Sequence, residues 1–206
     1  MKSMKQILAP LALAVLVAGG CAKPPMEQIE AAEKAVKEAQ QSGAATYAAE
    51  EYAKLEGNLA ALRKEVADQD GKFALFRDYG KAEQLSSSVK ADGERVRTEA
   101  TKKKEEAKAA ALQAQQVAQE AVRSTLDLVA KAPVGKDRAA LEAIKADAEA
   151  LNSSLNQVQA SLDKEDFATA QTQAKAIHEK SQAVSAEIER ALAKVGKGKS
   201  SAQKKK

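Results

Sequence analysis

Residues 73–132 read FALFRDYGKAEQLSSSVKADGERVRTEATKKKEEAKAAALQAQQVAQEAVRSTLDLVAKA and decide the fold that the sequence predicts. Mostly small or apolar residues recur there at alternating steps of four and three. This seam comprises Leu75, Tyr79, Ala82, Ser86, Val89, Gly93, Val96, Ala100, Lys103, Ala107, Ala110, Ala114, Val117, Ala121, Ser124 and Leu128. Such a period is typical of a helix that packs one face against neighbouring helices. We therefore expect one continuous helix from Phe73 to Ala132.

The composition of the 206-residue chain also favours helices packed along narrow seams. Charged residues make up 30% and aromatic residues only 3%, too few for the thick core of an ordinary globular domain. Gly and Pro number 10 and 4, too few for a loop-rich protein. The net charge of +4 is too small to indicate nucleic-acid binding by the whole chain. We expect an all-α fold and no nucleic-acid partner.

Four further helices are predicted from stripes of apolar residues. Their expected ranges are 26–42, 46–68, 137–162 and 167–195. Gly43 can stop the first helix because a left-handed backbone costs Gly little. Pro133 ends the long helix, since it cannot continue the helical hydrogen bonds. Asp137 can cap the helix that follows.

The connections between these helices are short, so neighbouring helices should be antiparallel. The segment from Thr98 to Glu106 contains no apolar residue except Ala100, and it divides the long helix into two halves. We expect two three-helix coiled-coil bundles that share this helix, similar in outline to a spectrin-type rod. Two separate helical hairpins are the alternative. The expected regions are 26–102 and 103–195, followed by a disordered Lys-rich tail at 196–206.

The beginning of the chain has the pattern of an export signal. Two lysines precede an apolar run at 7–18 that is too short to span a bilayer. The run closes on VAGGC at 17–21, which resembles the lipobox of bacterial lipoproteins. That resemblance implies cleavage between Gly20 and Cys21 and acylation of Cys21, with residues 1–20 as the signal peptide. An ordinary signal peptide that happens to contain a Cys is the alternative.

Lipidation would also explain why an exported chain has a single cysteine, which otherwise leaves an unpaired thiol. Several acyl chains on Cys21 would hold the protein on a membrane, with residues 21–25 as a short tether. Ala22 follows the Cys, at the position where Asp resembles an inner-membrane retention signal of enteric bacteria. The resemblance therefore implies the periplasmic face of the outer membrane in a Gram-negative bacterium.

A second resemblance begins in the first predicted helix. The Ala-rich run at 35–41, the motif GAATYA at Gly43 to Ala48 and the pair Asp78-Tyr79 resemble a domain-of-unknown-function family of helical envelope lipoproteins from Gram-negative bacteria. Ala49 stands where the family pattern Gly-Ala-x-x-Tyr-Ala-Pro has Pro. The resemblance implies a helical envelope lipoprotein, and it lends no catalytic residue.

The side chains that could carry chemistry are few. His178 is the only histidine, and a metal site or a general base would need partners that this chain lacks elsewhere. We expect His178 to be a solvated surface residue. Six aromatic residues are expected to plug the ends of the bundles: Tyr47, Tyr52, Phe73, Phe76, Tyr79 and Phe167. The sequence predicts a non-enzymatic protein with no metal and no cofactor.

The end of the chain is rich in lysine and has no acidic residue. Its candidate contacts with an anionic surface are Lys194, Lys197, Lys199, Lys204, Lys205 and Lys206. Each lysine near such a surface contributes about 1 kcal/mol. A tail that only improves solubility is the alternative. In the major outer-membrane lipoproteins of enteric bacteria, the C-terminal lysine is joined to peptidoglycan. Lys206 occupies the same position here, and this resemblance implies covalent attachment.

These features together predict a lipid-anchored, non-enzymatic helical spacer or scaffold in the periplasm, with peptidoglycan or another anionic envelope polymer as a partner. The alternative is a protein-binding adaptor module of an envelope transport or assembly complex. In that case the helical faces would bind a protein partner or a second copy of the chain.

Overall fold

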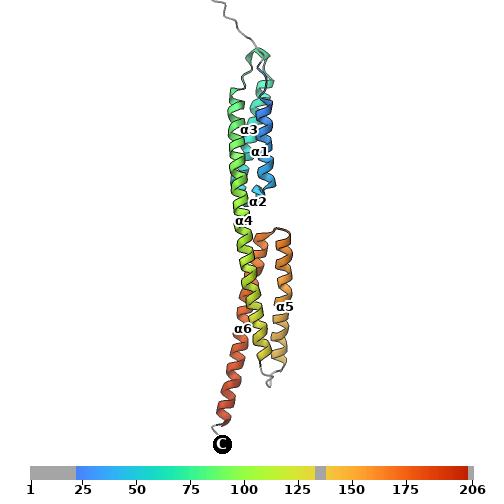
Figure 1. Cartoon of the computed structure of the whole chain (residues 1–206), viewed down its shortest axis with the longest axis vertical. Coiled ribbons are helices and arrows are strands. Elements are labelled where there is room, and N and C mark those ends of the chain that lie inside the picture. The colour runs from blue at the N-terminus through green and yellow to red at the C-terminus, as the bar shows by residue number, and fades with distance from the viewer. Residues whose placement is uncertain (1–21, 133–137, 204–206) are drawn as a thin grey trace, which may run out of the picture. The chain divides into compact units, whose positions relative to one another are not determined.

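A computed structural model describes residues 22–132 and 138–203, and these residues fold as an all-α bundle without strands (Figure 1). The helices are α1 (Met26–Gln41), α2 (Ala44–Tyr47), α3 (Ala49–Asp70), α4 (Gly80–Lys131), α5 (Arg138–Asp163) and α6 (Phe167–Gln203), with a 3-10 turn η1 (Ala74–Phe76) before α4. The chain divides into a first unit that ends at Thr98 and a second unit that begins at Glu99. Helix α4 contributes to both units, so the predicted all-α fold with a long shared helix is confirmed.

The first unit packs α1, α3 and the first part of α4 around small and branched residues. Its core includes Ile29, Val36, Leu55, Leu59, Leu62, Val89 and Val96. Gly93 lets α1 and α4 come close together, because a Cβ at this position would lie 2.8 Å from the Ala35 Cβ. Gly43 adopts the predicted left-handed backbone (φ 85°) directly after α1. The apolar stripes predicted for the helices at 26–42 and 46–68, which correspond to α1 and α3, are buried except for Val66, which is half-buried.

The second unit packs α5 and α6 against the rest of α4. Val129, Ile144, Ala148 and Ile188 form a buried cluster. Helix α6 begins after a tight turn in which Glu165 has a left-handed backbone (φ 57°), and the Thr169 N–H donates to Asp166 Oδ1 at 3.1 Å. The short connection expected between the helices at 137–162 and 167–195 is therefore a tight turn. The predicted roles of Pro133 and Asp137 lie outside the described residues.

The buried face of α4 follows the predicted seam only as far as Ala100. Beyond it the buried residues are Ala111, Gln115, Ala118, Val122, Thr125 and Val129. The predicted positions Val117 and Ser124 are exposed, so the prediction is wrong for them, whereas Ala107, Ala110, Ala114, Ala121 and Leu128 are half-buried beside the actual seam. Residues 101–106 have no apolar side chain that could show whether the next buried residue comes three or four positions on. The next fully buried residue after Ala100 is Ala111, eleven positions later. Three turns at 3.6 residues each need about eleven, so the same side of the helix returns at Ala111.

Helix α4 begins at Gly80 and not at Phe73. The Asp78 carboxylate accepts the N–H of Gly80, the first residue of the helix, at 2.9 Å and so stabilises the helix start there. The residues before it form the turn η1, in which Phe73, Leu75 and Phe76 are 70%, 72% and 74% exposed. The prediction that Phe73 and Phe76 plug the end of a bundle is wrong.

The remaining aromatic residues of the predicted set behave differently. Tyr52, Tyr79 and Phe167 are buried, as predicted, and Tyr47 is half-buried.

Helix α6 extends to Gln203, so the predicted disorder is wrong for residues 196–203. Lys, Ala and Gln are good helix formers, and adding a turn to an existing helix is much easier than starting one. These gains outweigh the cost of Gly196 and Gly198 within the helix.

Candidate functional site

The residues predicted to attach the chain to a membrane precede the described part. Gly20 and Cys21 lie outside the described residues, which begin at Ala22. Residues 22–25 are not helical and lead directly into α1, whose first N–H groups bond to Pro24 and Pro25 carbonyl oxygens. The attachment of these residues to a lipidated Cys21 stays a prediction.

The lysines predicted to contact an anionic surface fall into two groups. Lys194, Lys197 and Lys199 belong to the last part of α6. Lys204, Lys205 and Lys206 lie outside the described residues. The helical backbone brings the first three within two turns of one another, at positions that sequence alone assigned to an irregular tail.

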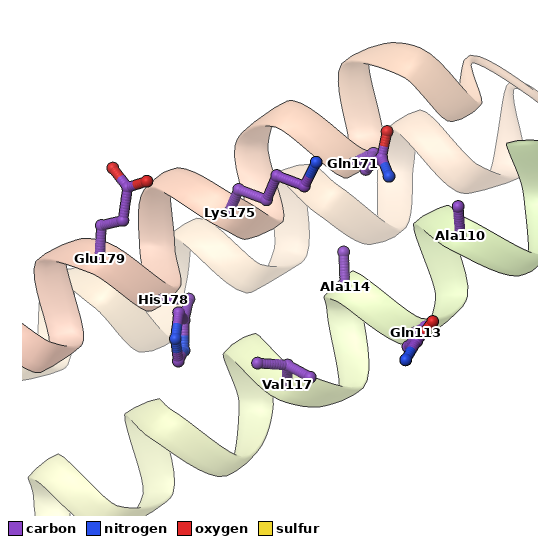
Figure 2. Close-up of a pocket in the computed structure, with 8 residues that line it drawn as sticks. All are labelled: Ala110, Gln113, Ala114, Val117, Gln171, Lys175, His178 and Glu179. Atoms are coloured by element: carbon purple, nitrogen blue, oxygen red, sulfur yellow. The ribbon is translucent and has the colours of Figure 1, made fainter.

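An open groove of about 270 Å³ lies between α4 and α6 in the second unit (Figure 2). Its walls are formed by Ala110, Gln113, Ala114, Val117, Gln171, Lys175, His178 and Glu179. The α4 side is made mainly of small apolar side chains, whereas the α6 side carries the polar groups. The groove exists because the seam shifts by one residue, which leaves Val117 at the surface instead of in the core.

His178 lies at this groove and is half-buried, so the prediction of a solvated surface histidine is wrong. Its Nδ1 atom is buried and has no hydrogen-bond partner among the described residues. In Figure 2 the ring lies toward Val117, whereas the Glu179 carboxylate points away from α4. No acid converges on the imidazole there, and the groove thus lacks the paired groups that a proton-transfer site needs.

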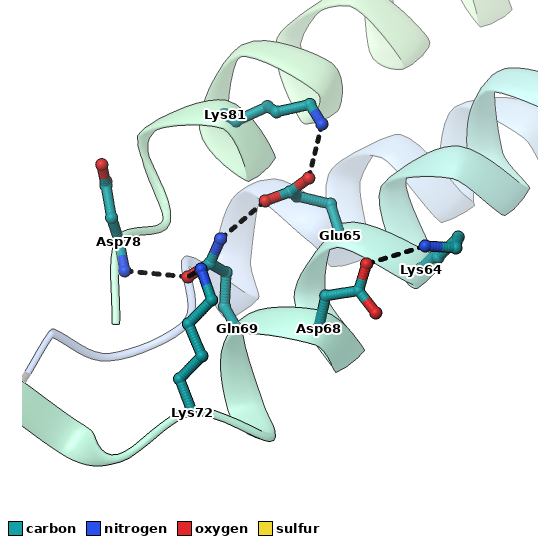
Figure 3. Close-up of polar contacts among 7 residues, drawn as sticks. All are labelled: Lys64, Glu65, Asp68, Gln69, Lys72, Asp78 and Lys81. Atoms are coloured by element: carbon teal, nitrogen blue, oxygen red, sulfur yellow. Dashed lines mark hydrogen bonds and ion pairs between the residues drawn. The ribbon is translucent and has the colours of Figure 1, made fainter. Parts of the chain in front are cut away.

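A polar cluster ties the end of α3 to the beginning of α4 (Figure 3). Gln69 is buried at its centre: its Nε2 donates to Glu65 Oε1 at 2.7 Å, and its Oε1 accepts from Lys72 Nζ at 2.9 Å and from the Asp78 N–H at 3.1 Å. Lys81 Nζ lies 2.6 Å from Glu65 Oε2. The hydrogen bonds from Lys81 and Gln69 hold the pKa of the Glu65 carboxyl below its usual value.

The same connection is fastened by two further side chains. The Tyr79 hydroxyl donates to Asp70 Oδ1. This hydrogen bond is the main cause, and burial the second cause, of a raised pKa for the Tyr79 hydroxyl. Arg77 donates from Nε to the Lys72 carbonyl oxygen at 3.0 Å and from Nη2 to the Asp70 carbonyl oxygen at 2.8 Å. These contacts hold the backbone of the turn in one conformation. The sequence pattern did not reveal them, because each joins residues on either side of a loop.

Within residues 22–132 and 138–203, no three His, Cys, Asp or Glu side chains gather in a way that could hold a metal ion. None of the described helices is both long and apolar enough to cross a membrane. No family model, curated protein or solved structure matches the chain.

Proposed function

We propose that this protein is a lipid-anchored, non-enzymatic helical spacer or scaffold of the bacterial cell envelope. It is held on the periplasmic face of the outer membrane by acyl chains on Cys21, and its Lys-rich end contacts peptidoglycan or another anionic polymer. The observation that carries the proposal is the sequence VAGGC at 17–21 after a short apolar run. Residues 22–25 support it, because they supply the non-helical tether that a lipidated cysteine needs before a folded unit.

The Cys21→Ser variant is expected to lose all incorporation of radiolabelled palmitate when it is produced in a Gram-negative host. The hydroxyl of Ser cannot accept the diacylglycerol through a thioether, so the leader should also stay attached. Electrophoresis and the intact mass of the chain measure both effects. Ala22→Ser is the matched control and should be labelled like the natural chain. Equal labelling of Cys21→Ser would contradict the lipid anchor.

Replacement of all six tail lysines by Gln is expected to weaken binding of the chain to isolated peptidoglycan sacculi at least tenfold. About 1 kcal/mol per lysine is available near an anionic surface, and 1.4 kcal/mol corresponds to tenfold in affinity. Co-sedimentation at low and high salt, with the chain from residue 21 onward carrying Cys21→Ser, measures this. The exchanged residues are Lys194, Lys197, Lys199, Lys204, Lys205 and Lys206.

A matched control removes the same charge from exposed positions elsewhere on the helices. Its exchanged residues are Lys34, Lys37, Lys54, Lys90, Lys145 and Lys180. The control should pellet with sacculi as the parent chain does. If the parent chain itself stays in the supernatant, the tether to the cell wall is wrong and a protein-binding adaptor becomes the better proposal.

A further inference from the structure

The turn before α4 exposes three large apolar side chains together, and we call Phe73, Leu75 and Phe76 the apolar tip. Each is at least 70% exposed, and the two Phe ring centroids are 6.3 Å apart. Large exposed apolar groups that gather in one place usually mark a contact surface. The buried residues of the first unit form its core without these three side chains.

The apolar tip is held in place by the polar contacts at its base. Gln69 accepts the Asp78 N–H, Arg77 bonds to two backbone carbonyl oxygens, and the Tyr79 hydroxyl bonds to Asp70. These bonds close the loop from both sides, so the exposed side chains project from a fixed base. A side chain fixed in this way loses little conformational freedom when it enters a binding partner.

The apolar tip lies at the end of the first unit where residues 22–25 lead into α1 (Figure 1). Helix α1 runs in the same direction as α4, since Glu27 shares a surface hollow with Ser86 and Glu38 Oε2 lies 2.7 Å from Arg97 Nη1. The start of α1 is therefore level with the second turn of α4. Figure 1 shows residues 22–25 leaving α1 toward the connection between α3 and α4.

We propose that the apolar tip inserts into the bilayer that holds the acyl chains of Cys21, so that the first unit touches its own membrane at two points. This inference rests on the proposed lipid anchor. The tip is exposed, which suits a fluid lipid surface, and Lys72 and Arg77 next to it in the sequence carry the positive charge that lipid phosphates attract. The nearby carboxylates of Asp70 and Asp78 already accept bonds from Tyr79 and the Gly80 N–H.

With the lipid anchor in place, a contact of only three side chains is sufficient to keep the apolar tip in the bilayer. Two Phe and one Leu bury too little apolar surface to hold a protein on a bilayer alone. Attachment at Cys21 keeps the tip at a high local concentration next to the lipid, so a weak second contact is occupied. The contact is apolar, and salt should therefore affect it far less than the contact of the Lys-rich end with an anionic polymer.

The test places one fluorescent label at the apolar tip of the acylated full chain in phosphatidylethanolamine–phosphatidylglycerol vesicles. Leu75→Cys supplies the only free thiol once Cys21 is acylated, and the intact mass establishes that acylation first. An environment-sensitive dye at this position should shift to the blue and be quenched by brominated acyl chains. Leu112→Cys is the matched control, because Leu112 is an exposed Leu (46%) that belongs to the second unit. Its dye should stay unquenched.

The variant Phe73→Ser/Leu75→Cys/Phe76→Ser should lose most of the quenching without any change in the thermal melt, since these side chains contribute little to the core. Equal emission from the dyes at positions 75 and 112 would overturn insertion. A tip that binds a protein pocket and not lipid would give this result. If the mass shows no acyl chains, the proposed anchor fails separately. The tip is then tested in the chain from residue 21 onward, with Cys21 coupled to a maleimide lipid of the vesicle and Leu75→Trp in place of the dye, since the chain has no Trp. Quenching of the Trp emission by brominated acyl chains supports insertion, and its absence overturns it.

Discussion

Gly93→Leu is expected to destabilise the first unit by roughly 3 kcal/mol or more, whereas Gly57→Leu is expected to stabilise it by about 0.5 to 1 kcal/mol. Both positions are inside helices, so both variants gain helix propensity in place of Gly. They differ in what a side chain would meet. A Cβ at Gly93 would lie 2.8 Å from the Ala35 Cβ and 3.0 Å from its carbonyl carbon, whereas a Cβ at Gly57 has no atom within 4 Å.

The strain at Gly93 cannot be relieved by rotating a side chain, because the atoms it would meet belong to the backbone and Cβ of α1. Helices α1 and α4 must move apart, and the small residues that pack beside Ala35 then lose their contacts. Urea unfolding followed by tyrosine emission measures the change, since all three tyrosines lie in the first unit and the chain has no Trp. Similar gains in stability for Gly93→Leu and Gly57→Leu would show that α1 and α4 do not approach so closely.

Periodicity was sufficient to predict much of this fold. The steps of three and four placed α1, α3 and α5 and the start of α6 within a few residues of their observed bounds, because each helix buries a single stripe, whereas α6 ends at Gln203 and not at residue 195. The same pattern failed in α4 beyond Ala100. A strict repeat of seven residues and a straight helix drift apart by about 20° per repeat, and the polar residues 101–106 offered nothing that would reveal when the register changes.

The misplaced start of α4 has a different cause. Leu75 continues the seam in sequence, but the Asp78 carboxylate and the Gln69 amide stabilise a turn in its place. The Gln69 contact joins two helices that meet only after folding, so a count of apolar steps cannot reveal it. The Asp78 contact is local, because it joins residues two positions apart, and it is a capping signal that the count of apolar steps ignored. The exposed tip and the groove at His178 follow from these two deviations. The candidate attachment residues Cys21 and the terminal lysines were predicted from local sequence and remain predictions.

Leu62→Ala is expected to cost the first unit about 2 to 5 kcal/mol, because Leu62 is completely buried and its removal leaves a cavity. Many of the buried residues of this unit are alanines, among them Ala32, Ala39 and Ala82, and such short side chains cannot fill a cavity by changing rotamer. A small domain has a free energy of unfolding of only about 5 to 15 kcal/mol, so the loss is a large share of the total. Leu112→Ala, at an exposed position, should change the stability by less than about 0.5 kcal/mol.

Two optical signals distinguish unfolding of the first unit from unfolding of the second unit. Tyrosine emission reports the first unit alone, while far-UV circular dichroism reports the helices of both. Leu62→Ala should lower the midpoint of the tyrosine transition much more than that of the last part of the dichroism transition. Ile188→Ala, which removes a buried side chain from the second unit, should do the reverse. If both variants shift both signals equally, the polar residues 101–106 transmit unfolding along α4, and the two units form one cooperative structure.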